Sequence, residues 1–384
     1  MTDTLRVRVY NVRFGDAVLV TIPDRDDGQT TIRHILVDFG NVLSNGGGED
    51  AVFKPIIEDI LSVLGGAPLD LYVMTHEHMD HVQGLLYASK QLGLELPVER
   101  SWLTASAEPG YYDSHPEARR KKNAALASYR QAVRLLGAAP SGASALGPLL
   151  LNNNPRSTGD CVDHIRTVAT QAPTYVHRER DIAGTHPFSE ARLELWAPEE
   201  DTSDYYGSFQ PIAFSIRSEG AAGGRAALRM PLPPRGVDSG AFYSLVESRR
   251  RGVFDNLLAI DRAANNSSIV FALEWRGWRL LFPGDAEQRS WKEMDKQGVL
   301  KPVHFLKVSH HGSWNGTPTG AVLDKILPVP PPDARKRHAA VSTCAGTYHN
   351  VPDKETRELL EQRCEVRSVE DSPQELFFDL GFQG

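Results

Sequence analysis

The chain has 384 residues, 41% of them hydrophobic and 24% charged, with a formal net charge of −7. This composition excludes collagen-like, low-complexity and intrinsically disordered chains and predicts a soluble globular protein. The N-terminus lacks the basic and apolar regions of a secretory signal, and no apolar run reaches the roughly 18 residues that a membrane-spanning helix requires. The three cysteines are few and widely spaced, which favours a reducing compartment. We therefore expect a cytoplasmic protein without a membrane segment.

Strand and helix patterns alternate in the first third of the chain. Alternation of apolar and polar residues and turn signals predict strands over residues 5–9, 17–22 and 32–37. Between Glu49 and Leu64 the apolar residues recur at steps of three and four, which predicts an amphipathic helix. The apolar run over residues 69–75 predicts a buried strand, and it leads directly into a histidine-rich segment.

The middle of the chain, residues 108–265, has a different character. Regular strand patterns are sparse there, glycine, proline, alanine and arginine are frequent, and one clear helix is predicted over residues 117–136. We interpret this stretch as an insertion that returns briefly to the core with one strand near residues 180–198. Strand patterns resume over residues 268–275, 278–282, 304–309, 339–343 and 375–380. The expected organisation is two β-rich halves, residues 1–107 and 266–384, separated by the insertion.

The segment after the fourth predicted strand concentrates metal-ligand types. His76, His78, Asp80 and His81 lie within six residues of one another. Imidazole and carboxylate groups are ligands for divalent metals such as zinc and manganese. In a loop, the first two residues can bind one metal while Asp80 and His81 turn toward a second. The alternative is a solvated polar loop that happens to be rich in histidine.

This segment, THEHMDH, resembles the H-x-H-x-D-H signature of the metallo-β-lactamase-fold hydrolases. That resemblance implies an α/β (α+β) fold, a four-layer αβ/βα sandwich with two divalent metal ions at the sheet edge. Asp38, in ILVDFG, would then support the metal loop, and Asp285, in WRLLFPGDAE, would bridge the two metals. The segments NNSSIVFALEWRGWRLLFPGDAE, FLKVSHHGS and AAVSTCAGTYHNVP more specifically resemble the hydrolase domain of ComEC-type competence proteins.

Two neighbouring histidines, His310 and His311, stand where the family has its closing metal ligand. The resemblance favours His310 as the ligand and leaves His311 either a role near the substrate or that of a hydrogen-bonded loop residue. His349 would project into the mouth of the site, unless it only marks the entry to a helix. With Asp80, we therefore expect His311 and His349 to take part in catalysis.

Many members of the family complete the first metal site with a third histidine. Candidates by residue type are His115, His164, His177 and His186, but none has family-like neighbours, and each is better explained as a surface histidine. ComEC-type domains often lack this ligand, and its absence would favour manganese over zinc at the first site. We leave this ligand unassigned.

Two metal ions would activate a water molecule for hydrolysis at neutral pH. The resemblance favours phosphodiester hydrolysis, with nucleic acid as the substrate, over a small-molecule phosphodiester or another ester. A regulatory module that binds metal without turnover is the second alternative, but the presence of both Asp80 and Asp285 favours an enzyme.

Three basic clusters, at residues 119–122, 249–251 and 335–337, could line a path for nucleic acid or could be solvated surfaces. Among the tryptophans, only Trp314 draws attention, because it lies close to the histidine pair. An open, arginine-lined groove beside the metals would favour a polymer, whereas a closed lid would favour a small ligand. The insertion could also bind a protein partner.

Overall fold

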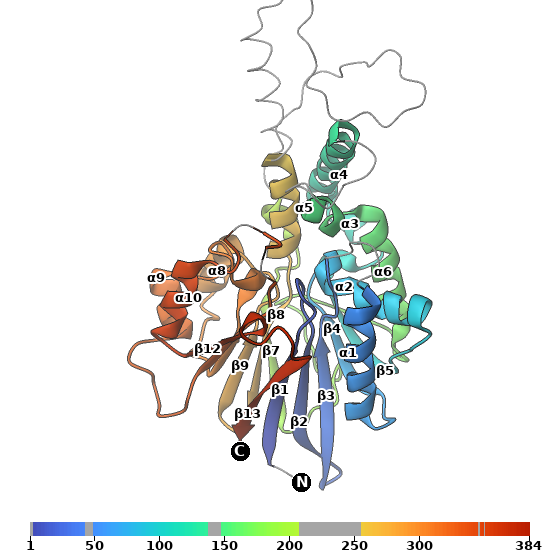
Figure 1. Ribbon diagram of the computed structural model, residues 1–384. Helices are drawn as coiled ribbons and strands as arrows, with labels where there is room; N and C mark the ends of the chain where they lie inside the picture. The colour runs from blue at the N-terminus through green and yellow to red at the C-terminus, as the bar shows by residue number, and fades with distance from the viewer. Residues whose placement is uncertain (1–2, 43–48, 137–146, 207–254, 345, 349) are drawn as a thin grey trace, which may run out of the picture.

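The computed structural model describes residues 3–42, 49–136, 147–206, 255–344, 346–348 and 350–384 (Figure 1). Within these residues the chain forms two mixed β-sheets with helices, an α+β arrangement. The first sheet has the strand order β13 (Phe377–Gln383), β1 (Thr4–Tyr10), β2 (Val18–Asp26), β3 (Gln29–Val37), β4 (Leu69–Met74), β5 (Val98–Thr104) and β6 (Thr174–Val176). The second has the order β12 (Glu365–Ser368), β11 (His338–Val341), β10 (Phe305–Lys307), β9 (Trp278–Phe282), β8 (Val270–Trp275) and β7 (Ala191–Ala197).

Each sheet combines an antiparallel part with a parallel part. Strands β13, β1, β2 and β3 pair antiparallel, and β3 to β6 pair parallel, with Ile35 opposite Leu71. In the second sheet β7, β8 and β9 pair antiparallel, and β9 to β12 pair parallel, with Phe305 opposite Leu280. Parallel strands end at the same edge of a sheet, so the segments that follow β3 and β4 meet, as do those that follow β9 and β10.

The two sheets face each other across one apolar core. Alternate residues of β1 to β5, such as Val7, Val20 and Trp102, pack with Phe271 and Phe305 of the second sheet. Burying a side chain of this size stabilises the fold by about 1.5–3 kcal/mol. This shared core fixes the position of one sheet relative to the other, and therefore of the sheet edges that carry the site.

Helices cover the outer faces of both sheets (Figure 1). On the first sheet these are α1 (Glu49–Leu64), α2 (Met79–Tyr87) and α6 (Pro155–Val168), which contribute Phe53, Val82 and Ile165 to a second apolar cluster. On the other sheet α8 (Gln288–Lys296), α9 (Gly320–Ile326) and α10 (Lys354–Glu361) cover a third cluster that contains Trp291 and Leu323. The helix predicted from Glu49 to Leu64 is confirmed with those bounds.

The predicted insertion is more closely joined to the sheets than expected. Its strand near residues 180–198 is β7, but α6 and β6 also belong to the body around the first sheet. Helix α6 was not predicted, although its buried residues Thr158, Cys161, Val162 and Ile165 follow the three- and four-residue steps of an amphipathic helix. Helices α3 (Tyr111–Ser114), α4 (Pro116–Leu136) and α5 (Gly147–Asn152) and the helical residues 255–266 gather above one edge of the sheets (Figure 1). In the described ranges no helix combines the length and apolar character needed to cross a membrane.

Candidate metal centre

Asp38 connects the ends of two parallel strands. It follows β3 directly, and its carboxylate accepts hydrogen bonds from the Thr75 backbone N–H at 2.8 Å and hydroxyl at 2.6 Å, just after β4. It also contacts His81 Nδ1 at 2.8 Å. Gly40 lets this segment approach closely, because a Cβ there would lie 2.3 Å from the His81 backbone nitrogen. Asp38 therefore has the contacts expected of a residue that supports the metal loop and orients His81.

Asp80, His81, Asp285 and His311 form a buried group of potential metal ligands. Their ligand atoms all lie within 4.8 Å of one another. His81 Nε2 is 3.2 Å from Asp285 Oδ2, and His311 Nε2 is 3.2 Å from Asp80 Oδ2. Asp80 and His81 lie in the first turn of α2, whereas Asp285 follows β9 and His311 follows β10. The group thus assembles from both sheets.

The histidines and carboxylates of this group strongly shift one another's pKa values. Burial alone would lower the pKa of both histidines, but Asp285 raises the pKa of His81 well above its usual value and, with Asp80, raises that of His311 to about 10. Although burial opposes it, these histidines hold the pKa of Asp285 well below its usual range. Asp80 Oδ1 and His81 Nε2 are buried without a hydrogen-bond partner in the described part of the chain. A divalent cation would satisfy these atoms, so the residues present fit a metal site.

His311, and not His310 as expected, lies with the carboxylates of the candidate metal centre. His311 is fully buried, its Nδ1 lies 2.8 Å from the Ser342 carbonyl oxygen, and its Nε2 faces the carboxylates. His310 is partly exposed and instead faces Asp261 and Glu287. Both histidines have positive φ, 49° and 55°, in a tight turn after β10. This turn decides which ring points inward, and no sequence spacing could have indicated it.

His76 and His78 face each other beside this group. His76 Nε2 is 3.0 Å from His78 Nδ1, and both side chains are buried. Burial and the neighbouring histidines lower the pKa of His76 well below its usual value, which favours the neutral form that binds metals. On its other side, His78 Nε2 lies 3.0 Å from Asn153 Oδ1. Asn153, from the predicted insertion, is a contact that the sequence did not reveal.

No third histidine joins this pair among the described residues. The four candidates have other surroundings: His115 contacts the Tyr111 carbonyl, His177 pairs with Glu179, His186 stacks on Phe188, and the pKa of His164 is lowered first by burial and then by Lys90. Besides the Asn153 amide, a carboxylate approaches His78, because Asp261 Oδ1 lies 3.8 Å from His78 Nε2. Asp261 lies in the helical residues 255–266, outside every motif recognised in the sequence.

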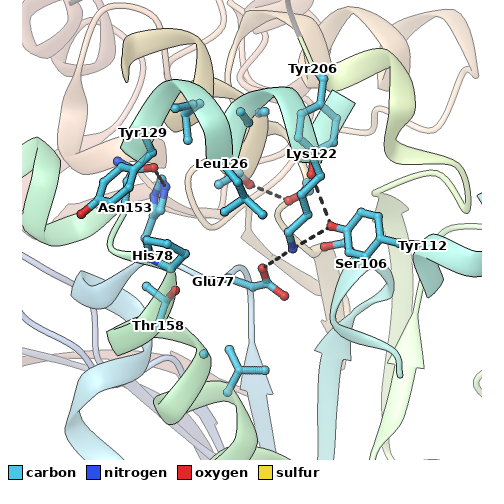
Figure 2. A pocket seen from close by; sticks show the side chains of 18 of the residues that line it. Glu77, His78, Ser106, Tyr112, Lys122, Leu126, Tyr129, Asn153, Thr158 and Tyr206 are labelled. Atoms are coloured by element: carbon cyan, nitrogen blue, oxygen red, sulfur yellow. Dashed lines mark hydrogen bonds and ion pairs between the residues drawn. The ribbon is translucent and has the colours of Figure 1, made fainter. Parts of the chain in front are cut away.

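A cavity of about 330 Å³ opens beside His78 (Figure 2). Its lining combines Glu77 and His78 from the metal loop with side chains of the predicted insertion, including Lys122 and Tyr112. Lys122 Nζ is 3.4 Å from Glu77 Oε2 and donates to the Tyr112 hydroxyl at 3.0 Å. Burial acts to lower the pKa of Lys122, but Glu77 raises it. The cavity therefore lies between His78 of the metal loop and the predicted insertion, and its walls are both polar and apolar.

The predicted basic clusters do not form an open groove of free cations in the described residues. Arg119 pairs with Asp113, Arg120 with Glu117, and Lys122 points into the cavity. Of the cluster at residues 335–337, Lys336 pairs with Glu365 and Arg337 is buried. The cluster at residues 249–251 lies outside the described residues. Trp314 is exposed.

The residue predicted at the mouth of the site, His349, also lies outside the described residues, so its role stays a prediction. Its neighbour Tyr348 approaches the centre through Phe14. The ring centroid of Phe14 is 4.9 Å from that of Tyr348 and 4.2 Å from that of His311. This aromatic contact is a part of the site that the sequence did not indicate.

Comparison with known proteins assigns no family to the chain. No family model matches it, and no curated protein sequence matches it. The chemistry that the site supports therefore follows from its own residues.

Proposed function

We propose that the chain is a metal-dependent hydrolase of the metallo-β-lactamase type that cleaves phosphodiesters with two divalent ions, zinc or manganese. The buried group of Asp80, His81, Asp285 and His311 carries this proposal, because two carboxylates and two imidazoles meet there within 4.8 Å. The facing pair of His76 and His78 supports a second ion beside it. Two sheets that share a core, with helices outside, are also compatible with the four-layer αβ/βα sandwich of that family.

In this proposal His76 and His78 would hold one ion, and Asp80, His81, Asp285 and His311 would hold the other. When bound, the ions supply an activated water and positive charge for the phosphate. The chain's own part is to orient the ligands: Asp38 faces His81, the Ser342 carbonyl faces His311, and Asn153 faces His78. Such contacts behind a ligand select its tautomer and its direction. The two carboxylates balance only part of the charge of two dications, which favours an anionic substrate.

The cavity beside His78 bears on the substrate class. About 330 Å³ is at the small end of ligand pockets, which are typically about 300–1,000 Å³. Such a space suits one nucleotide-sized group rather than the interior of a duplex. We therefore propose a phosphodiesterase that acts on nucleic acid at a strand end, with a small phosphodiester as the second candidate. A metal-binding regulatory module without turnover is disfavoured because both Asp80 and Asp285 are present in the buried group.

The proposal can be tested with the purified chain supplied with Mn²⁺ or Zn²⁺. We expect hydrolysis of bis(p-nitrophenyl) phosphate at neutral pH, and loss of more than about 100-fold in kcat/KM for Asp80→Asn and Asp285→Asn, because even residues behind metal ligands typically contribute about 10- to 100-fold. Asp324→Asn is the matched control, since Asp324 lies on the outer helix α9 and pairs there with Arg363. Full turnover in both site variants would refute the proposal.

The substrate class needs a separate assay. End-labelled single-stranded and double-stranded DNA and RNA should be incubated with each metal. Shortening from the ends of single strands supports the nuclease, whereas cleavage of the chromogenic ester without any change in polymer length supports the small-molecule alternative.

A further inference from the structure

A second group of potential ligands lies beside the proposed two-metal centre. Asp261, Glu287 and His310 each offer one ligand atom, and these atoms lie within 4.8 Å of one another. Asp261 belongs to the helical residues 255–266, Glu287 follows Asp285 by two residues, and His310 precedes His311. The proposed function leaves all three residues without a role. Both carboxylates are buried.

The amide of Asn265 lies among these three side chains. Its Nδ2 is 2.8 Å from Glu287 Oε1 and 3.3 Å from both Asp261 Oδ2 and His310 Nε2. Asn265 is only 1% exposed, yet its Oδ1 has no hydrogen-bond partner among the residues that the structure describes. A buried oxygen without a hydrogen-bond partner destabilises the fold unless another group satisfies it. Rotation of the amide by half a turn would direct this oxygen, a good ligand for hard cations, at the other three groups.

The negative charge of this group is incompletely balanced. Asp261 Oδ1 accepts a hydrogen bond from Asn153 Nδ2 at 2.7 Å and lies 3.8 Å from His78 Nε2. The neighbouring guanidinium is that of Arg262, whose Nε is 4.0 Å from Glu287 Oε2 and whose side chain is largely exposed. The His310 imidazole also lies close, with its Nδ1 3.5 Å from Glu287 Oε1. A divalent cation would balance both carboxylates.

The dimensions also fit one ion. Ligand atoms about 2.1–2.6 Å from a common hard cation lie at most about 4.2–5.2 Å apart, and the ligand atoms of Asp261, Glu287 and His310 all lie within 4.8 Å of one another. Three oxygens and one imidazole nitrogen form a ligand set of mainly oxygen donors, which suits manganese or magnesium better than zinc.

We propose that Asp261, Asn265, Glu287 and His310 form a third divalent-cation site, distinct from the two-metal centre, with manganese as its preferred ion. The site adjoins the centre, because the His310 backbone N–H donates to Asp285 Oδ1 at 3.2 Å. It also adjoins the cavity through Asn153. A cation at this site would add positive charge between the two-metal centre and the cavity. Its effect on a phosphate substrate rests on the proposed function, but the site itself does not.

Manganese stoichiometry of the full chain tests this site without an activity assay. After removal of metals, Mn²⁺ binding is measured by isothermal titration calorimetry and by metal analysis after dialysis. We expect three equivalents for the unaltered chain and two for Glu287→Gln, with Glu358→Gln on α10 as the matched control because Glu358 is exposed and only pairs with Lys354. His310→Gln, at a partly exposed residue, provides a second variant if Glu287→Gln does not fold, and we expect its third equivalent to bind at least 10-fold more weakly.

A double variant, Asp80→Asn with Asp285→Asn, separates this proposal from the two-metal centre. We expect it to retain one equivalent that Glu287→Gln then removes. If the unaltered chain binds a single ion that is lost in Glu287→Gln but kept in the double variant, the third site stands and the two-metal centre fails. If the unaltered chain, Glu287→Gln and His310→Gln all bind the same number of ions with the same affinity, the third site is refuted.

Discussion

His81 and Asp38 form a buried pair in which the Nδ1 of the imidazole lies 2.8 Å from the Oδ2 of the carboxylate. An ionised carboxylate can only accept, so Nδ1 carries the hydrogen and Nε2 is left to face Asp285 at 3.2 Å. The other contacts of Asp38 go to Thr75, at the end of β4. One side chain thus connects two strand ends and sets the direction of a proposed metal ligand.

Asp38→Asn should weaken metal binding without removing a ligand. An asparagine offers one acceptor oxygen, so it can serve either the Thr75 backbone N–H or His81, and the orientation of His81 is lost. We expect the affinity for Mn²⁺ or Zn²⁺ to fall by about 10- to 100-fold. Calorimetric titration of the metal-free chain measures this change. Asp324→Asn serves again as the control, and unchanged affinity in Asp38→Asn would contradict the role of Asp38.

Removal of metal should lower the thermal stability of the chain. The buried group that contains Asp80 and His81 leaves polar atoms without partners in the described residues, and a bound ion satisfies them. A ligand that binds only the folded state stabilises it by about 2.7 kcal/mol at a concentration of 100 times its Kd. We therefore expect EDTA to lower Tm and added Mn²⁺ to restore it, as measured by differential scanning fluorimetry. This change in Tm should be smaller when Asp80 and Asp285 are both replaced by Asn. A Tm that changes neither with EDTA nor with added metal would contradict a bound ion.

The cavity should control substrate affinity. Leu126 lines the cavity from α4, and Leu126→Trp would fill part of its 330 Å³. We expect KM for a dinucleotide substrate to rise at least 10-fold, about 1.4 kcal/mol of binding free energy, with unchanged metal stoichiometry. Ala127→Trp is the control, because Ala127 is the next residue of the same helix and is exposed. An equal effect of both substitutions on KM would show that the cavity does not bind the substrate.

Asp24 should make the stability of the fold depend on acid. Its carboxylate accepts hydrogen bonds from the Ser189 hydroxyl at 2.6 Å and from the Glu190 backbone N–H at 2.7 Å, which joins β2 to the segment before β7. Although burial acts to raise it, these bonds lower the pKa of Asp24 below its usual value of 3.8. A carboxyl whose pKa is lowered by folding stabilises the folded state above its unfolded pKa, and this contribution disappears as the pH falls through the folded value.

Asp24→Asn should therefore lower the free energy of unfolding at pH 7 by about 1–3 kcal/mol. The difference from the unaltered chain should become smaller as the pH falls below about 3.8, the usual pKa of the group. Urea denaturation at a series of pH values measures both effects. Asp26→Asn is the control, because Asp26 is 65% exposed and its ion pair with Arg33 is expected to contribute less than about 1 kcal/mol. A pH-independent difference between Asp24→Asn and the unaltered chain would contradict the assignment.

Local sequence patterns predict those helices and strands whose formation depends on residues close in sequence. The steps between Phe53, Ile56 and Ile60 predict α1 because one face of a helix repeats every three to four residues, and the structure buries all three. The mainly apolar run from Leu69 to Met74 predicts β4, because a strand that is buried on both faces has few polar residues. Short strands such as β6 and β12, with three and four residues, carry no period that could reveal them.

The candidate site was partly readable in the same way. His76, His78, Asp80 and His81 are close in sequence, so their proximity in space follows from chain connectivity, and Asp285 was expected from the resemblance of its segment, WRLLFPGDAE, to the family. The choice between His310 and His311 was not readable, because it depends on a turn with two consecutive positive φ angles. Asn153, in the turn between α5 and α6, and Asp261, in the helical residues 255–266, are far from the motif in sequence, and only packing brings them to His78.

The sequence by itself thus determined the strand–loop segments that carry the proposed ligands, because hydrophobic periodicity and ligand spacing are local properties. Tertiary structure decided which of these side chains meet. The face-to-face packing of the two sheets brings Asp285 and His311 to Asp80 and His81, and residues 108–265 add Asn153, Asp261 and most of the walls of the cavity. Contacts between residues far apart in sequence, such as that of His311 with Asp80 across 231 positions, arise from burial of a shared core, which no local pattern encodes.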